Sequence, residues 1–356
     1  EIPNPIDKFR ESIKANIDPV PIFHSMLIEI GSGKCVLVAQ IPDNQETPFI
    51  TKEGRIYRRV SDSSDPVSED NRYAIDRLVD NGKELEKRFG EFCTDEREFC
   101  EAEENQSWVN IFLSPYPLGI IERDEMLLSE GIEKLIQLSQ VPIKISLDSS
   151  KEIGTGNLPF NSGQVSVGSV ILKQADQSNL ALNHLSVEFF MDGRAKLFIP
   201  LKYLQCPHDI NIAELKSPEA RRAITTIVTS DKQHNSDLIR FFDIQYLWAA
   251  VTTLLNYYQE WYGKALEQNS IRVAISMENI WRLSPFCDAD QWGIYVQKFG
   301  LPVQNTDFRR MPNQKGKGYI LKFPLWTTIC AFVGMGFGLP TDLYSQIVFK
   351  PNTKND

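Results

Sequence analysis

Arg55, Tyr57, Arg58 and Arg59 are the residues whose types and spacing best suit a chemical role in this chain. They lie in the segment Gly54 to Val60, whose composition predicts a short β-strand. Alternate side chains of a strand share a face, so Arg55, Tyr57 and Arg59 would lie together, with Arg58 opposite. Guanidinium groups beside a phenol ring suit a phosphate backbone and a stacked base. The pattern predicts contact with nucleic acid; the alternative is a solvated edge strand whose arginines prevent aggregation.

Two further sets of polar residues are candidates for the same contact. Ser63 and Ser64 follow the strand and could add hydroxyl or backbone contacts, although serines in a turn before a helix need no ligand to explain them. A second basic cluster lies in a glycine-containing, loop-like segment that could wrap a phosphate backbone or could simply be solvated. Its members are Arg309, Arg310, Lys315, Lys317 and Lys322.

The sequence offers no clear catalytic set. Gly31 to Lys34 lacks the spacing of a phosphate-binding loop and precedes strand-like residues, so it predicts a turn. Carboxylates are dense between Asp95 and Glu104, but metal catalysis needs carboxylates brought together from separate elements. We therefore name no catalytic residue and no metal ligand, and the cofactor stays unknown.

Composition bounds the classes of protein that this chain can belong to. The net charge is -9 and the isoelectric point about 5.2, so a nucleic-acid site must be a local patch on an acidic body. Six cysteines are too few for a disulfide scaffold, which predicts reduced thiols in a cytoplasmic protein. The longest apolar run, Phe323 to Leu339, is glycine-broken and shorter than the roughly 20 residues of a membrane span. It predicts a buried helix and no membrane partner.

Residues 1–92 show the pattern of a small α+β unit. Asn4-Pro5 is a typical helix start, and two hairpins are expected, around Gly31–Lys34 and around Lys52–Gly54. The second hairpin would pair Phe49–Thr51 with Arg55–Val60. Ser68 is expected to cap the next helix. The acidic composition of residues 93–107 predicts a linker between two domains.

Residues 108–356 predict a second α+β domain of unknown type. Asp192-Gly193-Arg194 is a strong hairpin signal, Ile271 to Met277 alternates as a strand does, and Asp148 to Gln164 suggests a mobile loop. The longest helical pattern, rich in aromatic residues, runs from Ser236 to Leu266. Strands and helices do not alternate regularly, so we predict the α+β class, with antiparallel β-hairpins and packed helices in both parts.

Over about residues 1–92 the chain resembles the second half of a Schlafen AlbA-like domain. The resemblance rests on the helix from Asn4 to Ile17, the Gly33–Val38 strand, Pro48 and the segment Gly54-x-x-Tyr57-Arg58-Arg59. It implies a small α+β domain that binds nucleic acid. The candidates it carries over, for nucleic-acid contact or for holding the core, are Gly54, Tyr57, Arg58, Arg59, Ser63 and Ser64.

The same resemblance implies an alternative activity. Some members cleave transfer or ribosomal RNA with a metal held by two glutamates and an aspartate. Those carboxylates lie in the family's first half, whose motifs this chain lacks, so no catalytic residue is carried over, and ATP binding gains no support. Bacterial proteins of this type often append an α+β region, and some belong to phage-defence or regulatory loci.

Three functional hypotheses follow. The first is a cytoplasmic nucleic-acid-binding protein, for DNA or RNA, that is a fragment of an AlbA-like two-domain chain. The second is a metal-dependent ribonuclease whose carboxylates lie outside this sequence. The third is a structural subunit of a homo-oligomer or larger complex, in which Phe241 to Tyr262 would expose an apolar patch to a partner.

Overall fold

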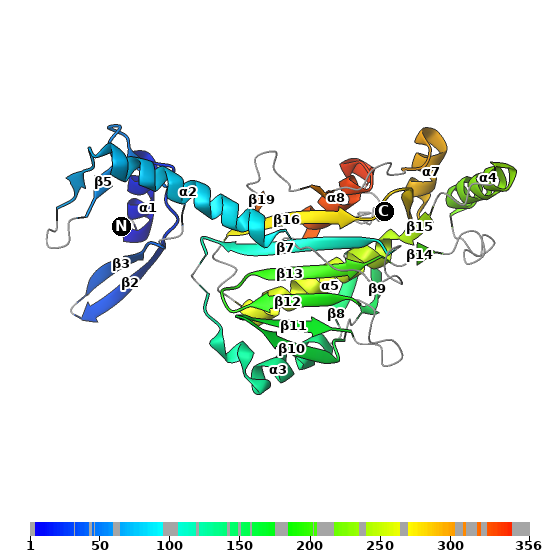
Figure 1. Ribbon diagram of the computed structural model, residues 1–356, viewed down its shortest axis with the longest axis horizontal. Coiled ribbons are helices and arrows are strands. Elements are labelled where there is room, and N and C mark those ends of the chain that lie inside the picture. Colours follow the sequence, from blue (N-terminus) through cyan, green and yellow to red (C-terminus); the bar gives the residue numbers. More distant parts are fainter. Residues whose placement is uncertain are drawn as a thin grey trace.

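Figure 1 shows a computed structural model of the chain, in which helices and mainly antiparallel sheets confirm the α+β class. None of the described helices is long and apolar enough to cross a membrane. The residues that the structure describes are 4–31, 33–42, 45, 47–59, 65–94, 106–118, 121–140, 143–148, 151–156, 159–174, 184–201, 203–204, 217–234, 240–263, 270–302, 309–310, 319–321 and 326–343.

The N-terminal elements, residues 4–92, form small sheets around two helices, and α2 runs from them to the rest of the molecule (Figure 1). Asn4 caps α1 by accepting a hydrogen bond from the backbone N–H of Ile6, as its position before Pro5 predicts. Asn71 caps α2 in the same way, by accepting a hydrogen bond from the backbone N–H of Tyr73. The prediction that Ser68 would be the cap was wrong, because the helix begins three residues later than expected. The bounds are α1 (Pro5–Asn16), β1 (Ile17–Asp18), β2 (His24–Gly31), β3 (Lys34–Gln40), β4 (Ile50–Thr51), β5 (Tyr57–Arg58), β6 (Val67–Ser68) and α2 (Arg72–Phe92).

The first predicted hairpin is confirmed, whereas the second forms only at its turn and its predicted strand pairing is wrong. β2 pairs with β3 across the Gly31–Lys34 turn. β4 instead pairs with β1, and β5 pairs with β6. The turn itself does form: the Gly54 N–H donates to the Thr51 carbonyl at 2.7 Å, and the Thr51 N–H donates to the Arg55 carbonyl at 2.8 Å. Its two arms then separate, since each finds its ladder partner in a strand outside the turn.

Residues 106–343 are organised around one large antiparallel sheet. Its strands follow the order β10-β11-β12-β13-β7-β16-β18, with β19 also paired to β16. The Asp192–Arg194 turn joins β12 to β13 as predicted. The strands are β7 (Trp108–Tyr116), β10 (Ser162–Ser166), β11 (Ser169–Lys173), β12 (Ser186–Phe190), β13 (Ala195–Pro200), β16 (Ser270–Glu278), β18 (Arg309–Arg310) and β19 (Tyr319–Leu321).

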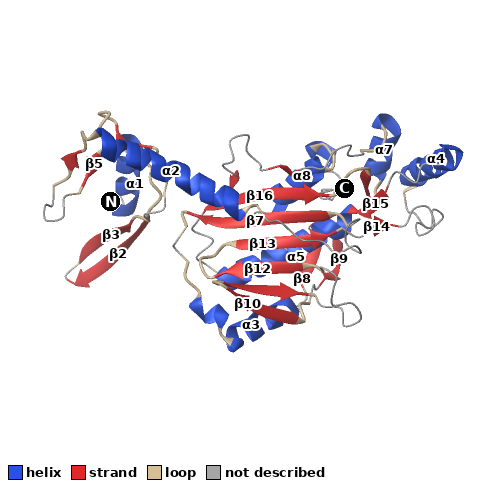
Figure 2. Ribbon diagram, in the orientation of Figure 1, coloured by secondary structure: helices blue, strands red, loops and turns tan. Residues whose placement is uncertain are grey.

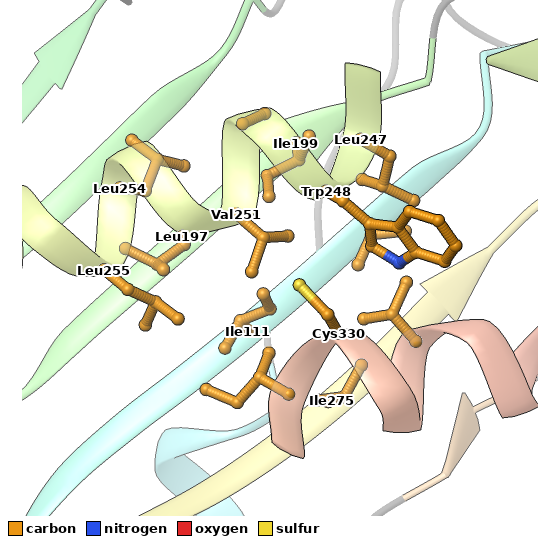
Figure 3. Packing of buried hydrophobic residues seen from close by; sticks show 14 of the residues in the cluster. Ile111, Leu197, Ile199, Leu247, Trp248, Val251, Leu254, Leu255, Ile275 and Cys330 are labelled. Carbon is orange, nitrogen blue, oxygen red and sulfur yellow. The ribbon is translucent and has the colours of Figure 1, made fainter. Parts of the chain in front are cut away.

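Helix α5 (Ile244–Tyr262) covers one face of this sheet, and Figure 2 shows it behind the strands. Figure 3 shows Val251 of α5 lying next to Ile111 of β7, with Trp248 of α5 and Cys330 of α8 (Trp326–Gly336) in the same core. Alternate residues of each strand supply this face, as the period of a strand requires. The apolar run near the C-terminus is therefore a buried helix, as predicted.

Three tyrosines of α5 donate hydrogen bonds to backbone carbonyls, two of them at the large sheet and one on helix α3. Tyr258 donates to Gly193 at 2.8 Å and Tyr262 to Phe190 at 2.6 Å, both at the β12–β13 turn, while Tyr257 donates to Ser139. Burial, and to a lesser extent Asp192, raises the pKa of Tyr258 well above its ordinary value. The phenol therefore remains a protonated donor.

Tyr258→Phe is expected to lower the free energy of unfolding by about 1–2 kcal/mol, because it leaves the buried Gly193 carbonyl without its donor. Chemical denaturation followed by circular dichroism measures the change. Tyr73→Phe, at a tyrosine that is 77% exposed, is the control and should leave stability within about 0.5 kcal/mol of the parent. Equal stability of the two variants would contradict this role for Tyr258.

A smaller sheet lies beside the large one, with the order β14-β15-β17 and a parallel pairing of β15 with β17. Helices α4 and α7 pack against each other next to it (Figure 1). The remaining elements are η1 (Asp124–Leu127), α3 (Ser129–Gln140), β8 (Ile143–Asp148), β9 (Lys151–Gly156), β14 (Tyr203–Leu204), α4 (Pro218–His234), β15 (Arg240–Asp243), β17 (Leu283–Phe286) and α7 (Asp290–Phe299).

Two sequence expectations in this part need correction. The long aromatic helix begins at Ile244, because Arg240–Asp243 form a strand and the Asp243 carboxylate caps the helix. It ends at Gly263, whose φ of 61° favours glycine. Strands β8, β9 and β10 occupy most of the predicted loop from Asp148 to Gln164.

The second face of the large sheet is contacted by the last turns of α2. Phe89 and Phe92 pack there against Phe112 of β7 and Phe198 of β13 in a separate apolar cluster. This contact fixes α2 on the sheet and so connects the N-terminal elements to it.

Candidate nucleic-acid interface

The basic segment predicted from sequence lies on the surface of the N-terminal elements. Arg55, Tyr57, Arg58 and Arg59 are all exposed. Only Tyr57 and Arg58 pair in a strand, opposite Ser68 and Val67 of β6, so the strand is shorter than expected. β5 lies at the end of the molecule remote from α4 (Figure 1). A nucleic acid could therefore approach it without contacting the large sheet.

Arg58 has a structural role that its sequence position does not reveal. Its Nε lies 2.9 Å from a carboxylate oxygen of Glu69, whose side chain is only 6% exposed. The other Glu69 oxygen accepts from the backbone N–H of Asn71, the cap of α2. Arg58 therefore joins β5 to the start of α2.

Arg58→Ala is expected to lower the free energy of unfolding by about 1 kcal/mol, because it leaves the buried Glu69 carboxylate without its cation. Urea denaturation of the variant measures the loss. Arg55→Ala, in the same segment, serves as the control and should change stability little. A loss no larger for Arg58→Ala than for Arg55→Ala would show that the ion pair does not hold the segment.

Arg55 and Arg59 differ from Arg58 in their surroundings. Within the described part of the chain, neither guanidinium forms an ion pair with a carboxylate. The Tyr57 hydroxyl lies 3.5 Å from a Glu53 carboxylate, at the outer limit of a hydrogen bond, and the side chain is 38% exposed. The three side chains are thus available to a ligand, although Glu53 lowers the local positive charge.

The other predicted contacts are not brought into this site. Arg309 and Arg310 pair with Ser276 and Ile275 of β16 in the large sheet, where a loop was expected. Ser63, Ser64, Lys315, Lys317 and Lys322 lie outside the described residues. Arg309 and Arg310 therefore do not share a sheet with Tyr57 and Arg58.

No group of three or more histidine, cysteine or acidic side chains that could hold a metal occurs among the described residues. The Gly31–Lys34 segment is a hairpin turn, with Gly31 at a φ of 92° and Gly33 at 71°, and it leads into a strand. This geometry lacks the helix start at which a phosphate-binding loop holds phosphate.

The apolar surface expected of the partner-binding hypothesis is not where it was predicted. Phe241, Trp248, Tyr258 and Tyr262 are at most 1% exposed and face the core. Exposed apolar side chains occur instead on the β2–β3 hairpin; they are Met26, Leu27, Ile28, Ile30, Val36 and Val38. A specific interface uses roughly 20–30 residues on each side, so these few side chains identify no partner.

Sequence reasoning missed an arginine–aromatic cluster where α2 meets the large sheet. The Arg272 guanidinium carbon lies 5.2 Å from the Phe89 ring centroid and 4.8 Å from that of Tyr116. The guanidinium carbon of Arg194 lies 4.9 Å from the ring centroid of Phe92 and 5.0 Å from that of Phe190. The available signal was Arg272 itself, a charge that stands between the apolar residues Ile271 and Val273 of a strand.

No family model matches the chain, and no significant match was found among curated proteins or solved structures. Functional inference therefore depends on two groups of side chains, those of the β5 segment and those of the arginine–aromatic cluster.

Proposed function

We propose that this chain is a cytoplasmic nucleic-acid-binding protein and that Arg55, Tyr57 and Arg59 form its contact surface. The observation that carries the proposal is the combination of two exposed arginines, uncommitted within the described part of the chain, with an exposed ring on a segment held in place by Arg58 and Glu69. The cytoplasmic part of the proposal is supported by four described cysteines that are free thiols, as is usual in a reducing compartment.

Each residue has a distinct role in this proposal. Arg55 and Arg59 bind phosphate oxygens, which contact DNA and RNA alike without reading their sequence. Tyr57 stacks on an unpaired base, a contact worth about 1–3 kcal/mol and tolerant of sequence. Because stacking needs an accessible base face, we expect single strands and loops to bind more tightly than duplex DNA.

Fluorescence anisotropy with labelled single-stranded DNA, duplex DNA and transfer RNA tests the proposal at about 50 mM salt, where phosphate contacts are strong. The expected result is binding to single-stranded DNA and transfer RNA. No binding to any of the three would overturn the proposal.

A parallel arm with magnesium or manganese, followed on a denaturing gel, addresses the ribonuclease alternative. The proposal expects intact RNA after incubation with the chain. Metal-dependent cleavage would favour the nuclease instead, and cleavage that persists with a metal chelator would indicate contamination.

A further inference from the structure

A cavity of about 110 Å³ lies between the last turns of α2 and the strands β7 and β16. Arg88 and Phe89 of α2 line one side, Tyr116 of β7 another, and Arg194 and Arg272 complete the wall. Three of its lining residues are arginines, and none is a carboxylate. The wall therefore combines guanidinium groups with aromatic rings, and the carboxylates beside Arg194 and Arg88, those of Asp192 and Glu84, lie outside the lining.

The sheet holds two of these arginines in fixed positions. Arg272 is 4% exposed, stands opposite Ser114 in the β16–β7 register, and lies against the rings of Phe89 and Tyr116. Arg194 is oriented by Asp192, whose two carboxylate oxygens lie 2.8 and 3.1 Å from its Nε. Guanidinium groups fixed in this way need little reordering when a ligand binds.

The third arginine lies at the rim of the cavity. The side chain of Arg88 is 67% exposed, and its Nε lies 3.4 Å from Glu84 on the same helix. It can therefore move toward a ligand that the two fixed arginines hold.

The thiol of Cys93 lies near two of the cations of this region. Burial raises the pKa of Cys93 to about 12, while Lys196 and Arg272 both act to lower it. Cys93 follows Phe92 directly, so these cations act at the end of α2 that forms the cavity wall.

We propose that this cavity binds the oxyanion group of a small ligand, a phosphate monoester or a carboxylate, with an adjoining apolar or aromatic part against Phe89 and Tyr116. Planar guanidinium groups match the oxygens of both anions through paired hydrogen bonds. The volume suits the anion of a small ligand with at most one ring beside it, since pockets for larger ligands span roughly 300–1,000 Å³. This site is separate from Arg55 and Arg59, and the proposal does not depend on nucleic-acid binding.

Isothermal titration calorimetry with phenyl phosphate, benzoate, inorganic phosphate and phenol tests the proposal. Phenyl phosphate or benzoate is expected to bind at least ten-fold more tightly than phenol, and the better of the two identifies the anion. Inorganic phosphate should bind more weakly than phenyl phosphate, because it lacks the ring. Equal binding of phenol and the two ring anions, or no binding of either anion at millimolar concentration, would overturn it.

Two variants locate the site. Arg88→Ala, at an exposed rim position, is expected to weaken phenyl phosphate binding three-fold or more, and Arg272→Met at least ten-fold. Lys87→Ala removes the same charge from the neighbouring residue of α2, which does not line the cavity, and should have no effect. If Arg272→Met fails to fold, Arg88→Ala decides the question alone: binding equal to that of Lys87→Ala would refute the site.

Discussion

Replacing Arg55 and Arg59 together by alanine is expected to weaken binding to single-stranded DNA on the order of 30-fold at about 0.1 M salt. Each arginine that neutralises a phosphate releases a condensed counterion, and the two releases multiply. Both side chains are exposed, and neither has a carboxylate partner among the described residues, so the change should leave the fold intact. Anisotropy titrations of the variant and the parent chain measure the ratio of their dissociation constants.

Arg221→Ala with Arg222→Ala is the matched control for this variant. It removes the same two charges from exposed positions on α4, at the opposite end of the molecule from β5 (Figure 1). Binding should then fall by no more than about two-fold, the size of a general electrostatic effect. Equal losses in both double variants would mean that net charge, and not the β5 segment, determines affinity.

Gly293→Ala is expected to destabilise the chain by about 3 kcal/mol, the largest effect on stability that we predict. An alanine Cβ at this position would lie 2.2 Å from the backbone nitrogen of Ala220 and 2.5 Å from the carbonyl carbon of Glu219. Those atoms belong to the first turn of α4, which packs across α7. Alanine is favoured over glycine in a helix by about 1 kcal/mol. Backbone atoms cannot move aside as a flexible side chain can, so the clash outweighs this preference and the net change destabilises the fold.

Urea denaturation followed by tryptophan fluorescence measures this loss, since Trp292 adjoins the substituted residue and is fully buried. Gln297→Ala, at an exposed position of the same helix, is the control and should change stability by less than about 0.5 kcal/mol. A Gly293→Ala variant as stable as this control would show that α4 and α7 do not pack as described.

Local signals in the sequence predicted the fold class and several elements correctly. The Asn4-Pro5 helix start, the Asp192–Arg194 turn and the alternation from Ile271 to Met277 each depend on residues adjacent in sequence. Cap, turn and strand geometry are determined within a few residues, so local sequence can specify them.

Errors arose where a distant residue decides the outcome. β4 pairs with β1, more than thirty residues before it in sequence, so no turn signal could identify its partner. The Arg240–Asp243 strand shortens the predicted helix because it pairs with Leu283–Phe286. In the candidate site, exposure of Arg55 and Arg59 followed from their charge, whereas the Arg58–Glu69 ion pair joins residues that only the fold brings together.

The salt dependence of single-stranded DNA binding, compared between the parent chain and the Arg55→Ala, Arg59→Ala variant, tests the central claim most directly. A plot of log affinity against log salt should be less steep for the variant by about 1.4, because each lost contact with a single strand removes a slope of roughly 0.7. Parallel plots for the two proteins would show that neither arginine contacts a phosphate, and would contradict the account.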